Sequence, residues 1–447
     1  MKVFSFLRPA PHTSPIENPQ EVETTYRYWR LRTFYAMYFG YVFYYFTRKS
    51  FTFIMPALHR EGFDLVSLGL IGSSLSIMYG CSKFFSGILG DQSNPRYFMA
   101  MGLILTGVCN ILFSLSSSLI LFAIFWGING CFQGWGWPGC AKLLTHWYAQ
   151  NERGFWWSLW NTSHNLGGAL IPLLIGLFAE HFGWRFCMVI PGIFCILGGF
   201  FLINRLRDTP ESLGLPPIEV YKNGEQKQKA KQEELPVNTI LSQFILKNPY
   251  IWALALSNFF VYVIRTAVND WSFLYYYEQS ANNPYAMASA CCCSFEVGGL
   301  FGSLFAGFLS DRLFLGKRNP VNIVYLIGML LMCYCMKTGA VAASFFPNMV
   351  VMFFTGFFIF GPQMLIGMAA AELSHKKAAA TASGFTGCLG YLGAAFAGLP
   401  LGHVVTHWGW DGYFTLLACC AFLAMVILLP LWDLKENPRQ EAIDALV

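Results

Sequence analysis

Two arginines in apolar surroundings are the residues of this chain whose type and spacing point most directly to chemistry. Arg48 interrupts a long hydrophobic run, and Tyr41 and Tyr45 precede it by seven and three residues. In a helix this spacing places two phenols and a guanidinium on one face. Arg265 follows Tyr262 at the same three-residue spacing in a second apolar segment.

A cation inside a membrane helix costs about 2.5–3.5 kcal/mol on insertion scales, so it is normally kept for a transport pathway or a buried partner. The alternative is an arginine near a helix end whose charge reaches the interface along its own stem. The repeated Tyr-x-x-Arg spacing argues against that alternative for Arg48. We therefore expect both arginines to serve a pathway or a buried partner.

The composition indicates an integral membrane protein. Hydrophobic residues make up 55% of the chain and charged residues only 12%, whereas a soluble domain carries about 25% charged residues. The lysines and arginines are scattered among short loops, so we expect no nucleic-acid partner. The stretch up to about Tyr28 lacks the apolar core of a signal peptide, and the first membrane helix is expected to direct insertion.

The reactive residue types form no enzyme-like pattern. Most of the fourteen cysteines lie within apolar runs, which indicates packing rather than disulfides or a metal site. The sequence contains no nucleophile–base constellation, metal cluster or nucleotide loop. We expect neither an enzyme nor a bound cofactor or metal.

Taking about 20 apolar residues as one crossing, the sequence predicts an all-α membrane protein of six plus six helices. The expected helices lie at 33–57, 66–89, 97–116, 119–144, 154–179, 185–205, 250–276, 287–309, 320–340, 347–371, 379–403 and 410–432. The expected domains are an N-terminal segment (1–32), a six-helix bundle (33–205), a polar linker (206–248), a second six-helix bundle (249–432) and a tail (433–447).

Basic residues predict the orientation of these helices. Most of the lysines and arginines lie at the two ends of the chain, in the linker and in every second loop, all of which would share one side of the membrane. The opposite loops carry only Arg60, Arg185 and Lys337. Because cytoplasmic loops are enriched in Lys and Arg, we expect both termini and the linker to lie in the cytoplasm.

The two halves of the chain repeat each other. Gly87–Asp91 after the second helix matches Gly307–Arg312 after the eighth, and the paired motifs lie about 220 residues apart throughout. A duplicated six-helix unit with parallel halves is how many secondary transporters are built, and their substrate site lies near the midplane between the halves.

The glycine–aspartate loops resemble the cytoplasmic motif of the major facilitator superfamily, with Gln92 where a cation is usual. Within that superfamily, seven segments resemble the organophosphate:phosphate antiporters. They are Tyr45–Ser50, Lys83–Gly87, Gln133–Cys140, Asn161–Gly168, Arg265–Trp271, Gly361–Gly367 and Lys376–Gly393. The chain is most similar to the hexose-6-phosphate and glucose-6-phosphate branch, which includes transporters and sensors.

This resemblance assigns Arg48 and Arg265 to phosphate binding, and their chemistry suits that role. A guanidinium offers two parallel charge-assisted hydrogen bonds to a phosphate and never deprotonates. We expect the two arginines, one from each half, to clamp the phosphate. Lys83 is expected either to add a third cation or to pair with Asp91 near its helix end.

Further binding residues are expected on the apolar helices. The resemblance favours His164 as a substrate ligand, with packing as the alternative, and a histidine there would bring pH dependence. Tyr41, Tyr45, Tyr262 and Tyr391 offer hydroxyls to phosphate or sugar oxygens, although aromatics at helical spacing also serve packing.

Other charged residues are expected to control the conformation. Lys49 and Asp270 lie close in sequence to the two arginines, and an ion pair between them would latch one state. Glu296 needs a partner because an unpaired buried charge is costly, and Lys83 and His164 are the candidates. Gating roles are also expected for three loop charges, Asp91, Asp311 and Arg312.

Together these features predict an alternating-access antiporter that exchanges a sugar phosphate, with glucose 6-phosphate preferred, for inorganic phosphate. Two empty arginines at low dielectric repel each other, and a bound anion offsets that repulsion and eases reorientation. The alternatives are a membrane sugar-phosphate sensor, or an antiporter for glycerol 3-phosphate or phosphoglycerate. We expect a monomer in the lipid bilayer, in a bacterial inner membrane rather than the endoplasmic reticulum.

Overall fold

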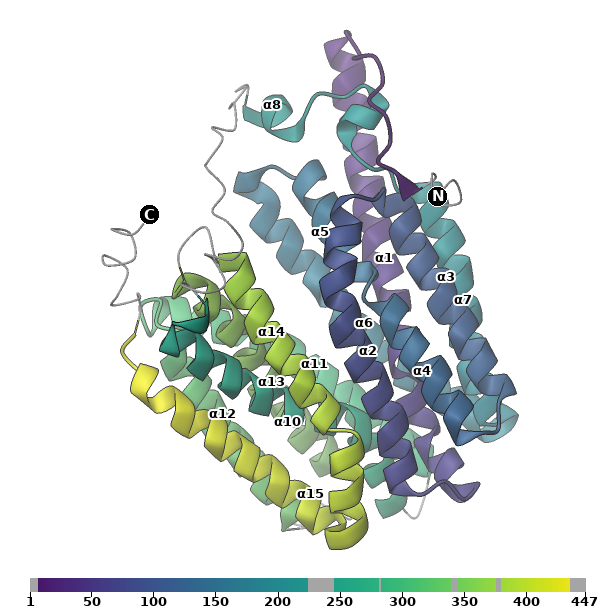
Figure 1. The fold of residues 1–447 in the computed structure, drawn as a ribbon, viewed down its shortest axis with the longest axis vertical. Helices are drawn as coiled ribbons and strands as arrows, with labels where there is room; N and C mark the ends of the chain where they lie inside the picture. Colours follow the sequence, from purple (N-terminus) through teal and green to yellow (C-terminus); the bar gives the residue numbers. More distant parts are fainter. Residues whose placement is uncertain (1–6, 224–244, 281–282, 339–344, 375–378, 435–447) are drawn as a thin grey trace. The chain divides into compact units, whose positions relative to one another are not determined.

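The computed structural model describes residues 7–223, 245–280, 283–338, 345–374 and 379–434. Within these ranges all regular secondary structure is helical, as the sequence predicted (Figure 1). The helices are α1 (Pro19–Arg60), α2 (Leu65–Asp91), α3 (Pro95–Leu115), α4 (Leu119–Gln133), α5 (Gly136–Trp147), α6 (Gln150–Phe182), α7 (Trp184–Arg205), α8 (Ile218–Asn223), α10 (Pro249–Gln279), α11 (Pro284–Arg312), α12 (Asn319–Lys337), α13 (Phe345–Glu372), α14 (Ala379–Phe396) and α15 (Leu399–Leu428). Two 3-10 turns, Pro210–Leu213 and Leu429–Leu431, complete the set. Much of the expected linker and tail, residues 224–244 and 435–447, lies outside the described ranges.

Helix α1 begins fourteen residues before the apolar segment expected at 33–57. Pro19 is its first residue and Glu21 lies in its first turn, and both residue types favour a helix start. Tyr26 in this extension is fully buried and packs on the rings of Trp147 and Tyr221. The apolar pattern of the sequence does not reach this part of the helix, which is stabilised by tertiary packing.

Two expected helices are interrupted in the structure. The segment expected at 119–144 consists of α4 and α5, and the segment expected at 379–403 consists of α14 and the start of α15. Helix α15 also bends at Gly409, whose φ of 62° is a conformation that favours glycine. The helix expected at 410–432 therefore starts at this kink and ends with the Leu429–Leu431 turn.

The chain divides into two compact units. The first unit comprises Met1–Phe51 and Ile77–Ala230, and the second comprises Thr52–Ser76 and Lys231–Val447. The end of α1 and the first half of α2 thus belong to the second unit, a grouping that the division into sequence halves did not predict.

Glycines allow the closest helix contacts inside the first unit. Helices α3 and α7 lie side by side (Figure 1), and Gly107 and Gly192 face each other across this contact. A Cβ atom on either glycine would come within 2.5–2.8 Å of the other's carbonyl oxygen. Small residues let membrane helices approach closely, so a larger side chain at either position would separate α3 from α7.

Within the described residues, nine stretches are long and apolar enough to cross a membrane. Helices α1 and α6 are long but fall outside this set, and in α1 the charged residues Arg48 and Lys49 lower the hydropathy. One stretch, Thr381–Leu431, has 51 residues, more than one crossing requires.

At one end of the first unit, the chain before α1 is tied to the chain after α7. The amide of Ala10 donates to the Asp208 carboxylate at 2.8 Å, and the amide of Ile16 donates to the Gly214 carbonyl at 2.8 Å. Lys142 of α5 lies 3.4 Å from the same Asp208 carboxylate. We call this end of the first unit the N-terminal end.

Candidate functional site

Arg48 is held in the first unit by contacts with aromatic rings and one amide. The guanidinium carbon lies 4.8 Å from the ring centre of Tyr45 on α1 and 4.6 Å from that of Tyr79 on α2. Its Nε donates to Oε1 of Gln133 at 3.2 Å. All three of these contacts are made with neutral groups, and they orient the guanidinium.

Gln133, the last residue of α4, has its amide orientation fixed by its own partners. Its Nε2 donates to the Tyr44 carbonyl at 3.1 Å and to the Thr47 hydroxyl at 3.0 Å. This leaves Oε1 to accept from Arg48, and the whole side chain is buried. The sequence analysis did not find this residue as a partner of Arg48, although Gln133 lies in one of the segments that carry the resemblance.

His164 of α6 lies among the tyrosines of α1. Its ring centre is 5.4 Å from that of Tyr45, with the rings stacked, and 4.8 Å from that of Tyr41. Trp160, one helical turn earlier, lies 5.1 Å away. The structure therefore brings Arg48, Tyr45, Tyr41 and His164 together, with Tyr45 in contact with both the imidazole and the guanidinium.

The two lysines expected near this cluster differ in position. Lys49 is buried, with 6% of its surface exposed. Lys83 is half-buried on α2, and its ammonium lies 5.9 Å from the Trp137 ring centre. The side chain of Asp91, the expected alternative partner of Lys83, lies outside the described residues.

In the second unit, Arg265 occupies a setting like that of Arg48. It is half-buried on α10, and its guanidinium carbon lies 5.0 Å from the ring centre of Phe360 on α13. One turn earlier, the Tyr262 ring meets the Tyr391 ring of α14 edge-on at 5.5 Å. A Cβ atom on Gly390 would come within 3.0 Å of the Tyr262 ring, so the missing side chain at this position lets the tyrosine lie close to α14.

The acidic residues expected to gate have contrasting environments. Glu296 of α11 is buried, with 2% of its surface exposed. Asp270 of α10 is half-buried and accepts a hydrogen bond from the Asn269 side chain at 2.6 Å. Both positions lie within long apolar helices, where a carboxylate is costly and usually functional.

The second glycine–aspartate loop forms an ion-pair network that the sequence predicted only in part. Asp311 pairs with Arg318 at 2.5 Å, and the same guanidinium lies 2.9 Å from Glu372 at the end of α13. Arg312, expected to act here, is exposed in the last turn of α11. Arg318 and Glu372 were missed because they are 54 positions apart in sequence and meet only after folding.

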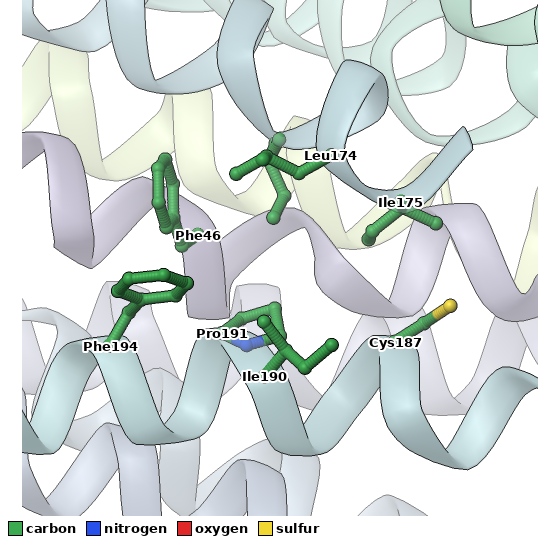
Figure 2. Close-up of a pocket in the computed structure, with 8 residues that line it drawn as sticks. Phe46, Leu174, Ile175, Cys187, Ile190, Pro191 and Phe194 are labelled. Atoms are coloured by element: carbon green, nitrogen blue, oxygen red, sulfur yellow. The ribbon is translucent and has the colours of Figure 1, made fainter. Parts of the chain in front are cut away.

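A small pocket between α1, α6 and α7 differs in character from this cluster (Figure 2). Its lining is apolar and consists of Phe46, Ile171, Leu174, Ile175, Cys187, Ile190, Pro191 and Phe194. It offers no cation to a phosphate, so it is not a candidate substrate site.

Comparison with known proteins identifies the family. A family model described as Major Facilitator Superfamily matches residues 37–398, with a second match at 284–445. The chain belongs to the major facilitator superfamily. This membership confirms the resemblance seen in the sequence, and it makes the chain a multi-pass membrane protein of a transporter family rather than an enzyme.

Relatives within this superfamily are similar over almost their whole length. A probable hexose phosphate transport protein of Chlamydia muridarum is 54% identical over 98% of this chain and 97% of the relative. The membrane sensor protein UhpC of Salmonella typhimurium is 46% identical over 98% and 99%. The hexose-6-phosphate:phosphate antiporter of the same organism is 32% identical over 93% and 94%.

A solved structure shows the same fold. It is a bacterial homologue of the human lysosomal transporter Spinster, in an inward-facing and unoccupied conformation. It matches with a TM-score of 0.69 and 14% identity, over 91% of this chain and 97% of that chain. At this identity the likeness establishes the fold of the major facilitator superfamily and no more.

Proposed function

We propose that this protein is an antiporter that exchanges a sugar phosphate, with glucose 6-phosphate preferred, for inorganic phosphate. The observation that carries the proposal is the setting of Arg48, a half-buried guanidinium oriented by Tyr45, Tyr79 and Gln133. Arg265 at the repeated position lies against a ring in the same way. Relatives named as a hexose phosphate transport protein and a hexose-6-phosphate:phosphate antiporter support the substrate class.

The proposed mechanism uses one arginine from each half of the chain. A phosphate bound by both guanidinium groups would offset their mutual repulsion, which is large where the dielectric constant is low. Tyr45, Tyr262, His164 and Tyr391 would donate to phosphate or sugar oxygens, with Tyr41 and Lys83 at the edge of the site. Exchange rather than net flux follows if the empty protein seldom reorients.

The proposed topology has twelve crossings. The nine candidate stretches become twelve if α1 and α6 also cross and Thr381–Leu431 crosses twice, with its turn at Gly409. Both termini would face the cytoplasm of a bacterial inner membrane, as the distribution of basic residues favours. Lys49, Asp270 and Glu296 would form the ion pairs that hold one conformation, in a protein that acts as a monomer.

A second candidate function is a membrane sensor of sugar phosphate. The 46% identity with the sensor UhpC exceeds the 32% identity with the antiporter, so overall sequence similarity does not separate the two activities. The 54% identity with the chlamydial transport protein makes transport the first choice.

Counterflow in proteoliposomes tests this proposal. Vesicles loaded with inorganic phosphate receive labelled glucose 6-phosphate, with glycerol 3-phosphate as a competing substrate. Arg48→Lys and Arg265→Lys keep the charge but remove the planar fork, and Arg185→Lys, at an exposed arginine, is the matched control.

We expect uptake that requires internal phosphate, falls at least tenfold in both site variants and persists in the control. Specific binding of glucose 6-phosphate without uptake would favour the sensor. Uptake that neither site substitution changes would contradict the arginine clamp while leaving antiport established.

A further inference from the structure

Four arginines gather at the N-terminal end of the first unit, on α1, at the start of α3 and at the end of α7. We call Arg32, Arg96, Arg205 and Arg207 the arginine cluster. The Nε of Arg96 donates to the Ile203 carbonyl of α7 at 2.6 Å. This bond joins the start of α3 to the end of α7.

The other three members also bond to neutral oxygens near the end of α7. Arg32 of α1 donates to the Asn204 side-chain oxygen at 3.1 Å, and Arg207 donates to the Leu206 carbonyl at 2.7 Å. Arg205 donates to the Tyr35 hydroxyl at 3.2 Å. Each arginine is half-buried, so the stems are packed and the positions of the charged groups are restricted.

Among the described residues, none of these four arginines pairs with a carboxylate. Other basic residues at the same end of the first unit do pair with acids. The pairs are Arg30–Glu152, Arg153–Glu219 and Lys142–Asp208. The arginine cluster is thus a concentration of positive charge with which no carboxylate of the described residues forms an ion pair.

The charges within the cluster also act on one another. Burial lowers the pKa of Arg207, and the neighbouring positive charges of Arg96 and Arg32 lower it further. Like charges this close are unfavourable unless an anion lies among them. A phosphate is well suited to lie there, because the planar fork of a guanidinium matches two phosphate oxygens.

Aromatic side chains place this cluster at the level of a membrane surface. The Trp29 ring lies 4.8 Å from the guanidinium carbon of Arg32 and 4.3 Å from that of Arg207. Tyr28, next to Trp29, is 53% exposed. Trp and Tyr are enriched where membrane proteins meet the headgroup layer.

Exposed apolar side chains continue from the cluster along the same helices. Phe39 lies two turns after Arg32 on the same side of α1 and is 47% exposed. On α7, Leu197 and Phe200 precede Asn204 by about two turns and one turn, and each is 59% exposed. A ligand that fits both surfaces has an anionic head and a hydrocarbon body.

We propose that the arginine cluster binds the phosphate of an anionic phospholipid, whose acyl chains lie along the exposed apolar side chains of α1 and α7. Basic pockets between membrane helices at the cytoplasmic surface are suited to such headgroups. The site is separate from the proposed substrate site, because Arg48 lies sixteen residues beyond Arg32, or about 24 Å along α1.

Lipid binding to the purified protein tests this inference. Native mass spectrometry would count the dioleoyl phosphatidylglycerol molecules retained in detergent, with dioleoyl phosphatidylcholine as the neutral comparison. The variant Arg32→Gln/Arg207→Gln removes two charges from the cluster. Arg8→Gln/Arg27→Gln removes the same charge from two exposed arginines near the N-terminus and is the matched control.

We expect the wild type and the control to retain phosphatidylglycerol in preference to phosphatidylcholine, and the cluster variant to bind it about thirtyfold more weakly. Equal retention by the cluster variant and the wild type would overturn the proposal. Displacement of the lipid by millimolar inorganic phosphate would also overturn it, by indicating a site for free anions. If the double variant does not fold, Arg207→Gln alone replaces it, with Arg27→Gln as its control.

Discussion

The hydroxyl of Ser73 on α2 bonds to the backbone on both sides of the break that precedes Leu399. It accepts the Leu399 amide hydrogen at 2.8 Å and donates to the Ala395 carbonyl at 2.8 Å. The indole of Trp271 donates to the Ala397 carbonyl at 2.9 Å in the same break. The interruption between α14 and α15 thus has its freed backbone groups satisfied by side chains from α2 and α10, as buried polar groups require.

Replacing Ser73 with alanine is expected to weaken the contact between α2 and α15. The change leaves a buried amide and a carbonyl without this partner, which costs about 1–3 kcal/mol. Spin labels at Leu70 on α2 and Trp408 on α15, both exposed, would report the separation in a cysteine-free background. We expect a longer or broader distance distribution and a lower melting temperature.

Ser74→Ala is the matched control for this experiment, because the Ser74 hydroxyl donates only to the Ile71 carbonyl of its own helix, at 2.7 Å. The control should keep the wild-type distribution. Identical distributions in Ser73→Ala and the wild type would show that the hydroxyl does not hold the two helices together.

Gly398 is expected to tolerate no larger side chain. A Cβ atom there would lie 2.6 Å from the Gly69 carbonyl and would also meet the Ser73 hydroxyl. Overpacking of this kind costs about 1–3 kcal/mol, so Gly398→Ala should lower the melting temperature by several degrees. In Gly384→Ala the new Cβ meets nothing within 4 Å, and this control should be as stable as the wild type or slightly more stable. Equal melting temperatures for the two variants would contradict the close approach at Gly398.

Changing Gln133 to glutamate is expected to weaken substrate binding, and it also lowers stability because the amide donors to the Tyr44 carbonyl and the Thr47 hydroxyl are lost. The new carboxylate would take the place of the amide oxygen that accepts from Arg48 at 3.2 Å. It would form an ion pair with the guanidinium and compete with a phosphate for it. We expect the KM for glucose 6-phosphate in counterflow to rise at least tenfold.

Gln20→Glu makes the same chemical change at an exposed position in the first turn of α1, where a negative charge is favourable. Its KM should match the wild type. A wild-type KM in Gln133→Glu would mean that Arg48 does not act in binding.

The sequence predicted the contacts within one helix of the site better than the contacts between helices. The helical spacing placed Tyr45 on the face of Arg48, and the structure puts the two side chains in contact. Tyr79 and Gln133 could not be assigned to Arg48 in this way, because their positions depend on how α2 and α4 pack against α1. Periodicity predicts which residues share a helix face, but it does not identify which residues of another helix meet that face.

The same distinction applies to the fold. Hydropathy located the apolar segments, but it did not detect that α1 begins at Pro19 or that α14 ends before Gly398. The first feature depends on the packing of Tyr26 and the second on hydrogen bonds from Ser73 and Trp271. Both depend on residues more than 100 positions away in sequence.

Arg318 is expected to stabilise the ends of α11 and α13, whereas Arg312 is not. The Arg318 guanidinium lies 2.5 Å from Asp311 and 2.9 Å from Glu372. Hydrogen bonds to Glu372 raise the pKa of Arg318, burial opposes this shift, and Asp311 adds to it. Since the carboxylates are partly exposed, each pair is worth at most about 1 kcal/mol, and Arg318→Gln should lower the melting temperature by a few degrees.

Salt separates this electrostatic effect from lost packing. Raising the ionic strength screens exposed charges, so the difference between Arg318→Gln and the wild type should shrink at high salt. Arg312→Gln removes the same charge from the exposed last turn of α11. Its melting temperature should equal that of the wild type at every salt concentration. If Arg312→Gln were the more destabilised variant, the network would be centred on Arg312, the arginine that the loop motif itself contains.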